Sequence, residues 1–281
     1  MKTPDSLKRL VSFFLKPVLP YMELHLTDHC NLNCKGCDHF SPLARHKNAN
    51  IEQYREDIYR LKKLFRNIGK IRLMGGEPLL HPHPEAFVFL TRKAFPRASI
   101  HFVTNGILLP KANKEFWHAC RKTDTVIDIS VYPPNQNNVT EWCDLCAQKN
   151  VKVVAFGRSN NGDLSDEGNV QVFLKHMNIN GTSDKNTSFT NCRKKFNCPF
   201  LHEGKLYTCM MPALVHYFND AFGYQISTDG GIDIHQKVTG KQIVEHLSKP
   251  IETCRWCSHH FTPFTWGISR KLIEDWATEN E

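Results

Sequence analysis

The strongest constraint on the fold is an alternation of strand-like and helix-like segments between Tyr21 and Phe156. Short runs rich in β-forming residues, such as KIRLMGGEP and SIHFVTNG, are separated by segments whose apolar residues recur at helical spacing, such as 51–69. Strands that alternate with helices of about a dozen residues form parallel β–α–β units. The sequence therefore predicts an α/β fold in which five parallel strands form a barrel or an open sheet.

The alternation fades after Phe156, and a second cysteine-rich region runs from Cys192 to Cys257. A chain of 281 residues has room for one barrel-sized domain and a small additional one. We expect a basic N-terminal segment at 1–20, the barrel-like domain at 21–185, and a small domain with an aromatic tail at 186–281.

Composition limits the partners and the compartment. The net charge of +8 favours an anionic partner, but the basic residues are spread along the chain, which argues against specific nucleic-acid binding. No apolar run approaches the roughly 20 residues of a transmembrane span. Without a secretory signal, eleven closely spaced cysteines indicate metal ligation in a reducing, cytoplasmic compartment rather than disulfides.

Three of these cysteines, Cys30, Cys34 and Cys37, fall in one loop after the first expected strand, in the stretch HCNLNCKGCDHF. Three such thiolates suit an iron–sulfur cluster with one iron left without a protein ligand. They also suit a structural zinc ion if a nearby histidine supplies the fourth ligand. The three cysteines alone leave both metal sites open.

A second motif, MGGEP at 74–78, ends the next strand, so it lies at the same edge of the sheet. Its two glycines allow a ligand to approach the backbone, and Glu77 adds an acceptor for a positively charged group. Together the two motifs resemble those of the radical S-adenosylmethionine (SAM) superfamily.

The resemblance implies a partial (β/α)6 barrel related to the TIM barrel, with a [4Fe–4S] cluster on Cys30, Cys34 and Cys37. The fourth iron would be chelated by SAM, and an electron donor such as flavodoxin or ferredoxin would reduce the cluster. Further residues are implied to bind SAM, four of them in the glycine motif and two at later strand ends: Gly75, Gly76, Glu77, Pro78, Asn105 and Ser130.

One position departs from the family pattern. The residue before the third cysteine is commonly aromatic in the family and packs near the adenine, whereas this chain has Gly36. We therefore expect Phe40 or His39 to line the adenine pocket instead.

The second cysteine-rich region resembles the twitch and SPASM extensions of radical SAM enzymes. This implies an auxiliary [4Fe–4S] cluster on Cys192, Cys209, Cys254 and Cys257, with Cys198 as the alternative to Cys192. A zinc ribbon that pairs Cys254 and Cys257 with a second Cys-x-x-Cys at 143–146 remains an open alternative. The 143–146 pair falls in an expected helix, where i and i+3 residues share one packed face.

A cluster with four protein ligands has no open iron for substrate, so electron transfer is its natural role. We expect oxidation or epimerisation of a small polar molecule, such as a sugar or nucleotide-linked sugar. Oxidation needs a base, and epimerisation needs a thiol that returns hydrogen. The candidate bases are His25, His29, His81 and Arg158, and the candidate thiols are Cys198 and Cys120.

The sequence leaves two other functions open. Radical enzymes that modify ribosomal peptides often carry an additional leader-binding domain, and the 20 residues before the first expected strand leave no room for one. A small molecule, for which the net charge favours an anionic one, is therefore preferred over a peptide as the substrate. A zinc-binding module without enzymatic activity is the remote alternative.

Overall fold

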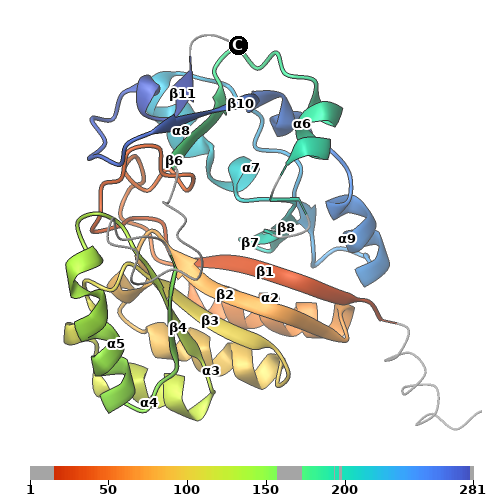
Figure 1. Cartoon of the computed structure of the whole chain (residues 1–281). Coiled ribbons are helices and arrows are strands. Elements are labelled where there is room, and N and C mark those ends of the chain that lie inside the picture. The colour runs from red at the N-terminus through yellow and green to blue at the C-terminus, as the bar shows by residue number, and fades with distance from the viewer. Residues whose placement is uncertain (1–15, 157–172, 193, 196–197, 279–281) are drawn as a thin grey trace, which may run out of the picture.

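The computed structural model describes residues 16–156, 173–192, 194–195 and 198–278 of the chain (Figure 1). Its main sheet has the strand order β5-β4-β3-β2-β1-β7-β8-β9. The first five strands in the chain are parallel neighbours, as the sequence predicts. They are β1 (Val18–Thr27), β2 (Asn67–Gly75), β3 (Ser99–Thr104), β4 (Val126–Ser130) and β5 (Val153–Phe156).

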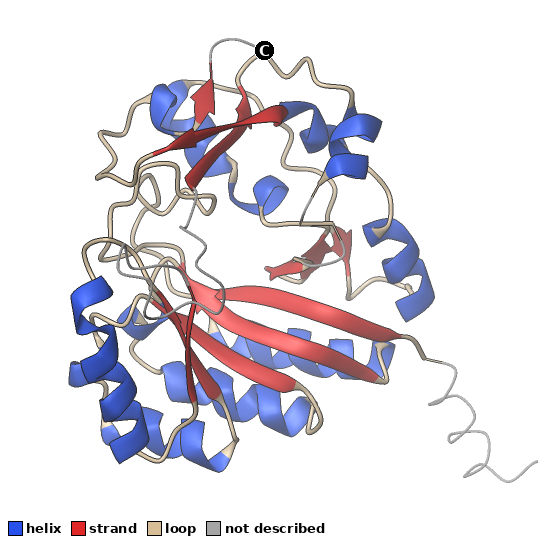
Figure 2. Cartoon of the chain, viewed as in Figure 1, coloured by secondary structure: helices blue, strands red, loops and turns tan. Residues whose placement is uncertain are grey.

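Four helices connect these strands and cover one face of the sheet (Figure 2). They are α2 (Ile51–Leu64), α3 (Pro84–Ala94), α4 (Lys114–Lys122) and α5 (Val139–Gln148). The helix expected at 51–69 ends earlier, because residues from Asn67 onward already belong to β2. The right-handed β–α–β connection explains why all four helices cover the same face.

Helix α2 shows how the sequence builds this layer. The Asn50 side chain caps its N-terminus by accepting hydrogen bonds from the amides of residues 52 and 53. Ile58 and Leu61 on its inner face are fully buried in the main core, and burial of each contributes about 1.5–3 kcal/mol. The opposite face of the helix is exposed and charged, so the hydrophobic pattern fixes its orientation.

Strand β1 separates the core from the interior of the partial barrel. Met22, Leu24 and Leu26 are buried in the core shared with the helices. Side chains alternate along a strand, so Glu23 and His25 lie on the other, inner face. This polar inner face faces away from the helices.

The C-terminal part contributes to two sheets. Strand β7 adds in parallel to β1, and β8 and β9 follow it as antiparallel strands at the edge. A separate three-stranded sheet has the order β10-β6-β11. The strands are β6 (Phe173–Asn178), β7 (Phe200–His202), β8 (Lys205–Tyr207), β9 (Ile232–Asp233), β10 (Cys257–Phe264) and β11 (Ala277–Thr278). The helices are α6 (Lys185–Asn191), α7 (Met211–Leu214), α8 (His216–Phe222) and α9 (Gly240–Leu247).

This arrangement is consistent with the expected partial barrel. Six neighbouring strands of the main sheet, from β5 through β1 to β7, are parallel, and β6 pairs with β10 and β11 instead. Strand β7, expected in the small domain, extends the main sheet. The first strand begins at Val18, within the segment expected at 1–20.

No helix in the described ranges has the length and apolar character that a membrane crossing requires.

Candidate active site

The loop that carries Cys30, Cys34 and Cys37 follows β1 at the carboxyl edge of the sheet. All three cysteines line a cavity of about 370 Å³, which we call the first cavity. Its other walls include residues at the ends of β2, β3 and β4, namely Gly75, Gly76, Asn105 and Ser130. The structure therefore brings the two predicted motifs and both predicted strand-end residues to one site.

The glycines of the MGGEP motif allow the β2 loop to contact the cysteine loop. The amide of Gly76 donates to Thr27 O at 2.8 Å, and the amide of Glu77 donates to His29 O at 3.0 Å. A Cβ on Gly76 would lie 2.2 Å from His29 O, so no other residue fits there. Pro78 is buried at the start of a 3-10 turn and does not line the cavity.

Glu77 does not offer its carboxylate to a ligand, which corrects the expected role. The side chain is fully buried and accepts hydrogen bonds from Thr104 Oγ1 at 2.7 Å, Asn105 N at 2.9 Å and Leu79 N at 3.0 Å. Burial raises the pKa of this carboxyl group to about 7. Glu77 thus ties the end of β3 to the β2 loop.

N–H groups are directed at a sulfur atom of the first cysteine group, as is common around metal-bound thiolates. The Leu32 amide donates to Cys30 Sγ at 3.3 Å, and Asn105 Nδ2 lies 3.7 Å from the same sulfur. Burial raises the pKa of all three thiols, that of Cys34 to about 11, so they ionise when a metal binds.

Within the described residues, no three His, Cys, Asp or Glu side chains are grouped to hold a single metal ion. Instead the three thiols are spread around the first cavity. This donor set, with N–H groups directed at sulfur, fits a [4Fe–4S] cluster.

Phe40 does not line the first cavity, which corrects the expected adenine contact. Its ring is buried in a second hydrophobic cluster, against Phe218 and Trp276. The first cavity is instead lined by His39 and by the ring of Phe264, which comes from β10. No pattern in the sequence indicates that Phe264 would reach this site.

The C-terminal segment is hydrogen-bonded directly to the cysteine loop. The Lys35 amide donates to Gly267 O at 2.8 Å, and the Ser269 amide donates to Asn33 O at 2.7 Å. Trp276 Nε1 donates to the carbonyl of Cys37 at 2.9 Å. We call residues 264–276 the C-terminal strap, because they hold the loop from the side opposite the sheet.

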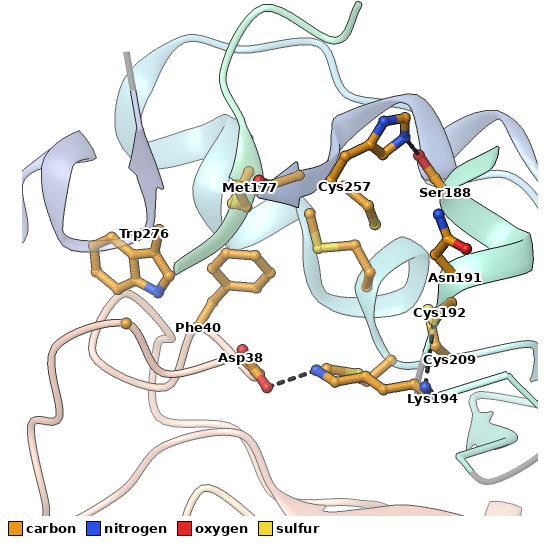
Figure 3. A pocket seen from close by; sticks show the side chains of 15 residues that line it. Asp38, Phe40, Met177, Ser188, Asn191, Cys192, Lys194, Cys209, Cys257 and Trp276 are labelled. Atoms are coloured by element: carbon orange, nitrogen blue, oxygen red, sulfur yellow. Dashed lines mark hydrogen bonds and ion pairs between the residues drawn. The ribbon is translucent and has the colours of Figure 1, made fainter. Parts of the chain in front are cut away.

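A second group of thiols gathers around a smaller cavity of about 110 Å³, the second cavity. Cys192, Cys209 and Cys257 line it, among apolar side chains that include Met177 and Trp276 (Figure 3). Cys254 also lies near the group. Burial raises the pKa of Cys257, and the neighbouring Cys209, Cys254 and Cys192 raise it further. The Lys194 amide donates to Cys192 Sγ at 3.3 Å.

Cys198 lies to one side of this group. Burial, then the carboxylate of Glu23 and then Cys209 raise the pKa of Cys198 to about 12, so Cys198 lies near both the inner side of β1 and one member of the group. The thiols that act electrostatically on Cys254 and Cys257 include Cys192 but not Cys198. The arrangement therefore favours Cys192 as the fourth member.

The structure places the thiols of two predicted assignments where they cannot take part in catalysis or bind the predicted zinc ion. Cys120 is fully buried in the main core on α4, next to Cys146, so it cannot return hydrogen to a substrate. Cys143 and Cys146 on α5 pack against the same core, remote from the C-terminal thiols in the fold (Figure 1). The predicted zinc ribbon is therefore wrong. Arg158, a candidate base, lies outside the described residues.

None of the three candidate base histidines lines the first cavity. His25 contacts Asp28 and His39 through its two ring nitrogens, both at 2.8 Å. His29 contacts the Lys47 backbone, and His81 contacts Ala49 O at 3.2 Å. Among the described histidines it is His39 that faces the cavity.

The first and second cavities share a wall. Gly36 and Asp38 line both of them. Across this wall, Lys194 Nζ forms an ion pair of 2.6 Å with Asp38 (Figure 3). Groups held in the two cavities are therefore separated by one short loop.

Comparison with known proteins gives a family match over part of the chain. Residues 24–153 match the model of the Radical SAM superfamily. The chain is 30% identical over 149 residues to the GTP 3′,8-cyclase of Clostridium acetobutylicum, covering 48% of this chain and 46% of that protein. It is 32% identical over 99 residues to the same enzyme of Nautilia profundicola, covering 34% and 31%. The matched region thus spans less than half the length of these relatives.

One solved structure matches most of the fold. BtrN, in complex with AdoMet and 2-DOIA, superimposes with a TM-score of 0.50 at 17% identity, covering 87% of this chain and 95% of that chain. At this identity the likeness concerns the fold alone.

Proposed function

Because residues 24–153 match the model of the Radical SAM superfamily, we propose that the chain is a radical SAM oxidoreductase acting on a small polar molecule. Members of this superfamily use a [4Fe–4S] cluster and SAM. Cys30, Cys34 and Cys37 would hold that cluster, and the strand ends that line the first cavity would surround SAM. We further propose an auxiliary [4Fe–4S] cluster on Cys192, Cys209, Cys254 and Cys257.

When bound, the first cluster and SAM supply a 5′-deoxyadenosyl radical that takes a hydrogen atom from carbon, and the auxiliary cluster supplies a one-electron acceptor. The residues of this chain position and shield that chemistry. The C-terminal strap and the ring of Phe264 cover the cysteine loop, which limits access of water. A one-electron donor such as flavodoxin or ferredoxin is the partner that this chemistry needs.

The observation that carries the proposal is the wall shared by the two cavities. A substrate that loses a hydrogen atom and then a proton holds one surplus electron, which must leave for the oxidation to be complete. The second thiol group lies directly across Gly36 and Asp38 from the first cavity, so an acceptor there would be close. This supports oxidation over epimerisation, which needs no such acceptor.

Iron content and SAM cleavage test the proposal. The anaerobically reconstituted full chain should hold about eight irons, and dithionite with SAM should release 5′-deoxyadenosine. Cys34→Ala should abolish that release, whereas the matched variant Cys143→Ala, on α5, should retain it. Retained cleavage in Cys34→Ala would falsify the assignment.

Solvent deuterium separates the two reaction types once a substrate turns over. Oxidation leaves no deuterium from heavy water on the reacting carbon, because that carbon receives no hydrogen. Incorporation of one deuterium would indicate epimerisation by a thiol and would contradict the proposed oxidation.

A further inference from the structure

The inner face of the main sheet carries charged side chains beside the first cavity. Glu23 of β1, Arg72 of β2 and His101 of β3 lie in one row across the sheet, because the register pairs them directly. Asp128 of β4 pairs with Val103 and so lies one row nearer the carboxyl edge. We call these four residues the inner charged layer.

Arg72 is the centre of this layer and also lines the first cavity. Its guanidinium lies 3.5 Å from Glu23 Oε1 and 3.3 Å from Asp128 Oδ2. His101 Nδ1 is 3.2 Å from the same Asp128 oxygen. Two carboxylates thus share one guanidinium, and Lys70, further from the carboxyl edge, attracts Asp128 without forming an ion pair with it. The positive charge of Arg72 is already balanced.

Two polar atoms of the layer have no hydrogen-bond partner in the described parts of the chain. They are Arg72 Nε, a donor, and Asp128 Oδ1, an acceptor, and both are buried. Asp128 as a whole is 7% exposed. An unpartnered buried polar atom is unfavourable, and such atoms in native proteins call for a partner that is bound separately. A hydroxyl group can partner both kinds of atom, and an ammonium group can donate to Asp128 Oδ1.

We propose that the inner charged layer recognises the substrate, and that it selects a hydroxyl or amino group on a small molecule without a phosphate. The inference deepens the proposed function and rests on it. A phosphate placed here would face the carboxylates of Glu23 and Asp128 and find no uncompensated cation in the layer. An ammonium group would be attracted by the same two carboxylates.

The experiment compares matched probes on the reconstituted full chain with SAM bound. Glucosamine, glucosamine 6-phosphate and GTP are titrated by calorimetry. We expect glucosamine to bind about tenfold more tightly than either phosphorylated probe, since like charges at a binding site are unfavourable. We also expect Asp128→Asn to remove most of this preference. Equal or tighter binding of a phosphorylated probe, no binding of glucosamine, or a preference unchanged in Asp128→Asn would each overturn the inference.

A matched control lies on the turn before the same strand. Asp124 is 71% exposed and pairs with Lys152, so Asp124→Asn should keep the full preference. If Asp128→Asn does not fold, as judged by its iron content, Glu23→Gln tests the second carboxylate in the same way.

SAM cleavage distinguishes a failure of substrate recognition by the inner charged layer from a failure of the proposed function. If the chain releases 5′-deoxyadenosine but prefers the phosphorylated probes, the proposed function stands and the inference about the inner charged layer is wrong. If the chain does not cleave SAM, the proposed function is wrong, whichever probe the chain binds.

Discussion

The ring of Phe264 lies directly over Gly36, and its Cζ is 2.5 Å from the position that a Cβ on residue 36 would occupy. Gly36 also has a φ of +64°, which side chains rarely tolerate. Both facts follow from the way the C-terminal strap packs on the cysteine loop. An aromatic ring from β10 therefore fills the space beside Cys37.

Gly36→Ala should lower the free energy of unfolding by about 2–4 kcal/mol, because it adds overpacking to backbone strain. Urea unfolding of the metal-free chain measures this loss. Gly223→Ala is the matched control, since Gly223 has a φ of +73° and a Cβ added there would meet nothing within 4 Å. If the two variants lose equal stability, the contact with Phe264 has no energetic weight.

The buried carboxyl group of Glu77 should make stability depend on pH. Burial raises its pKa from 4.5 to about 7, so the carboxyl group ionises at a higher pH in the folded chain than in the unfolded chain. Its contribution is complete below about pH 4.5 and is lost as pH rises through about 7, by up to about 3 kcal/mol. Urea unfolding between about pH 5 and 8 should show this decline in the wild type and a flatter profile in Glu77→Gln. Parallel profiles would contradict it.

Cys192 and Cys198 offer a matched pair of substitutions. Cys192→Ser should reduce the iron content from about eight to about four per chain, because it removes a ligand of the proposed auxiliary cluster. Cys198→Ser should keep about eight irons, since its thiol faces Glu23 rather than Cys254 and Cys257. The reverse pattern would assign Cys198 as the ligand.

Cys120→Ala should cost about 1 kcal/mol of stability without affecting SAM cleavage. The thiol is fully buried in the main core, so its removal leaves a small cavity but changes nothing at the first cavity. Thermal unfolding and the rate of 5′-deoxyadenosine release measure the two effects. A loss of cleavage at unchanged iron content would show that the core position of Cys120 is misjudged.

The parallel strands and the shared edge were predictable from the sequence because both depend on local patterns. Alternation in β1 and helical spacing in α2 are each set within one segment, and parallel strands bring their carboxyl ends together. For this reason Cys30, Gly76 and Asn105 were expected near one another, and the structure places all three at the first cavity.

Contacts between distant segments were not predictable in this way. No local pattern indicates that Phe264 packs on Gly36, or that β6 leaves the main sheet to pair with β10. The role of Glu77 was misread because a carboxylate beside glycines looks accessible, whereas the end of β3 buries it. Cys120 was considered reactive because its sequence position does not reveal which face of α4 is covered.

The C-terminal strap has a consequence for biosynthesis. Cys37 and Trp276, which are hydrogen-bonded to each other, are 239 residues apart in the chain. The ribosome therefore exposes the cysteine loop long before it makes the segment that covers it. Iron delivered during translation would meet an open loop, and the enclosed site exists only once the C-terminal strap has folded back.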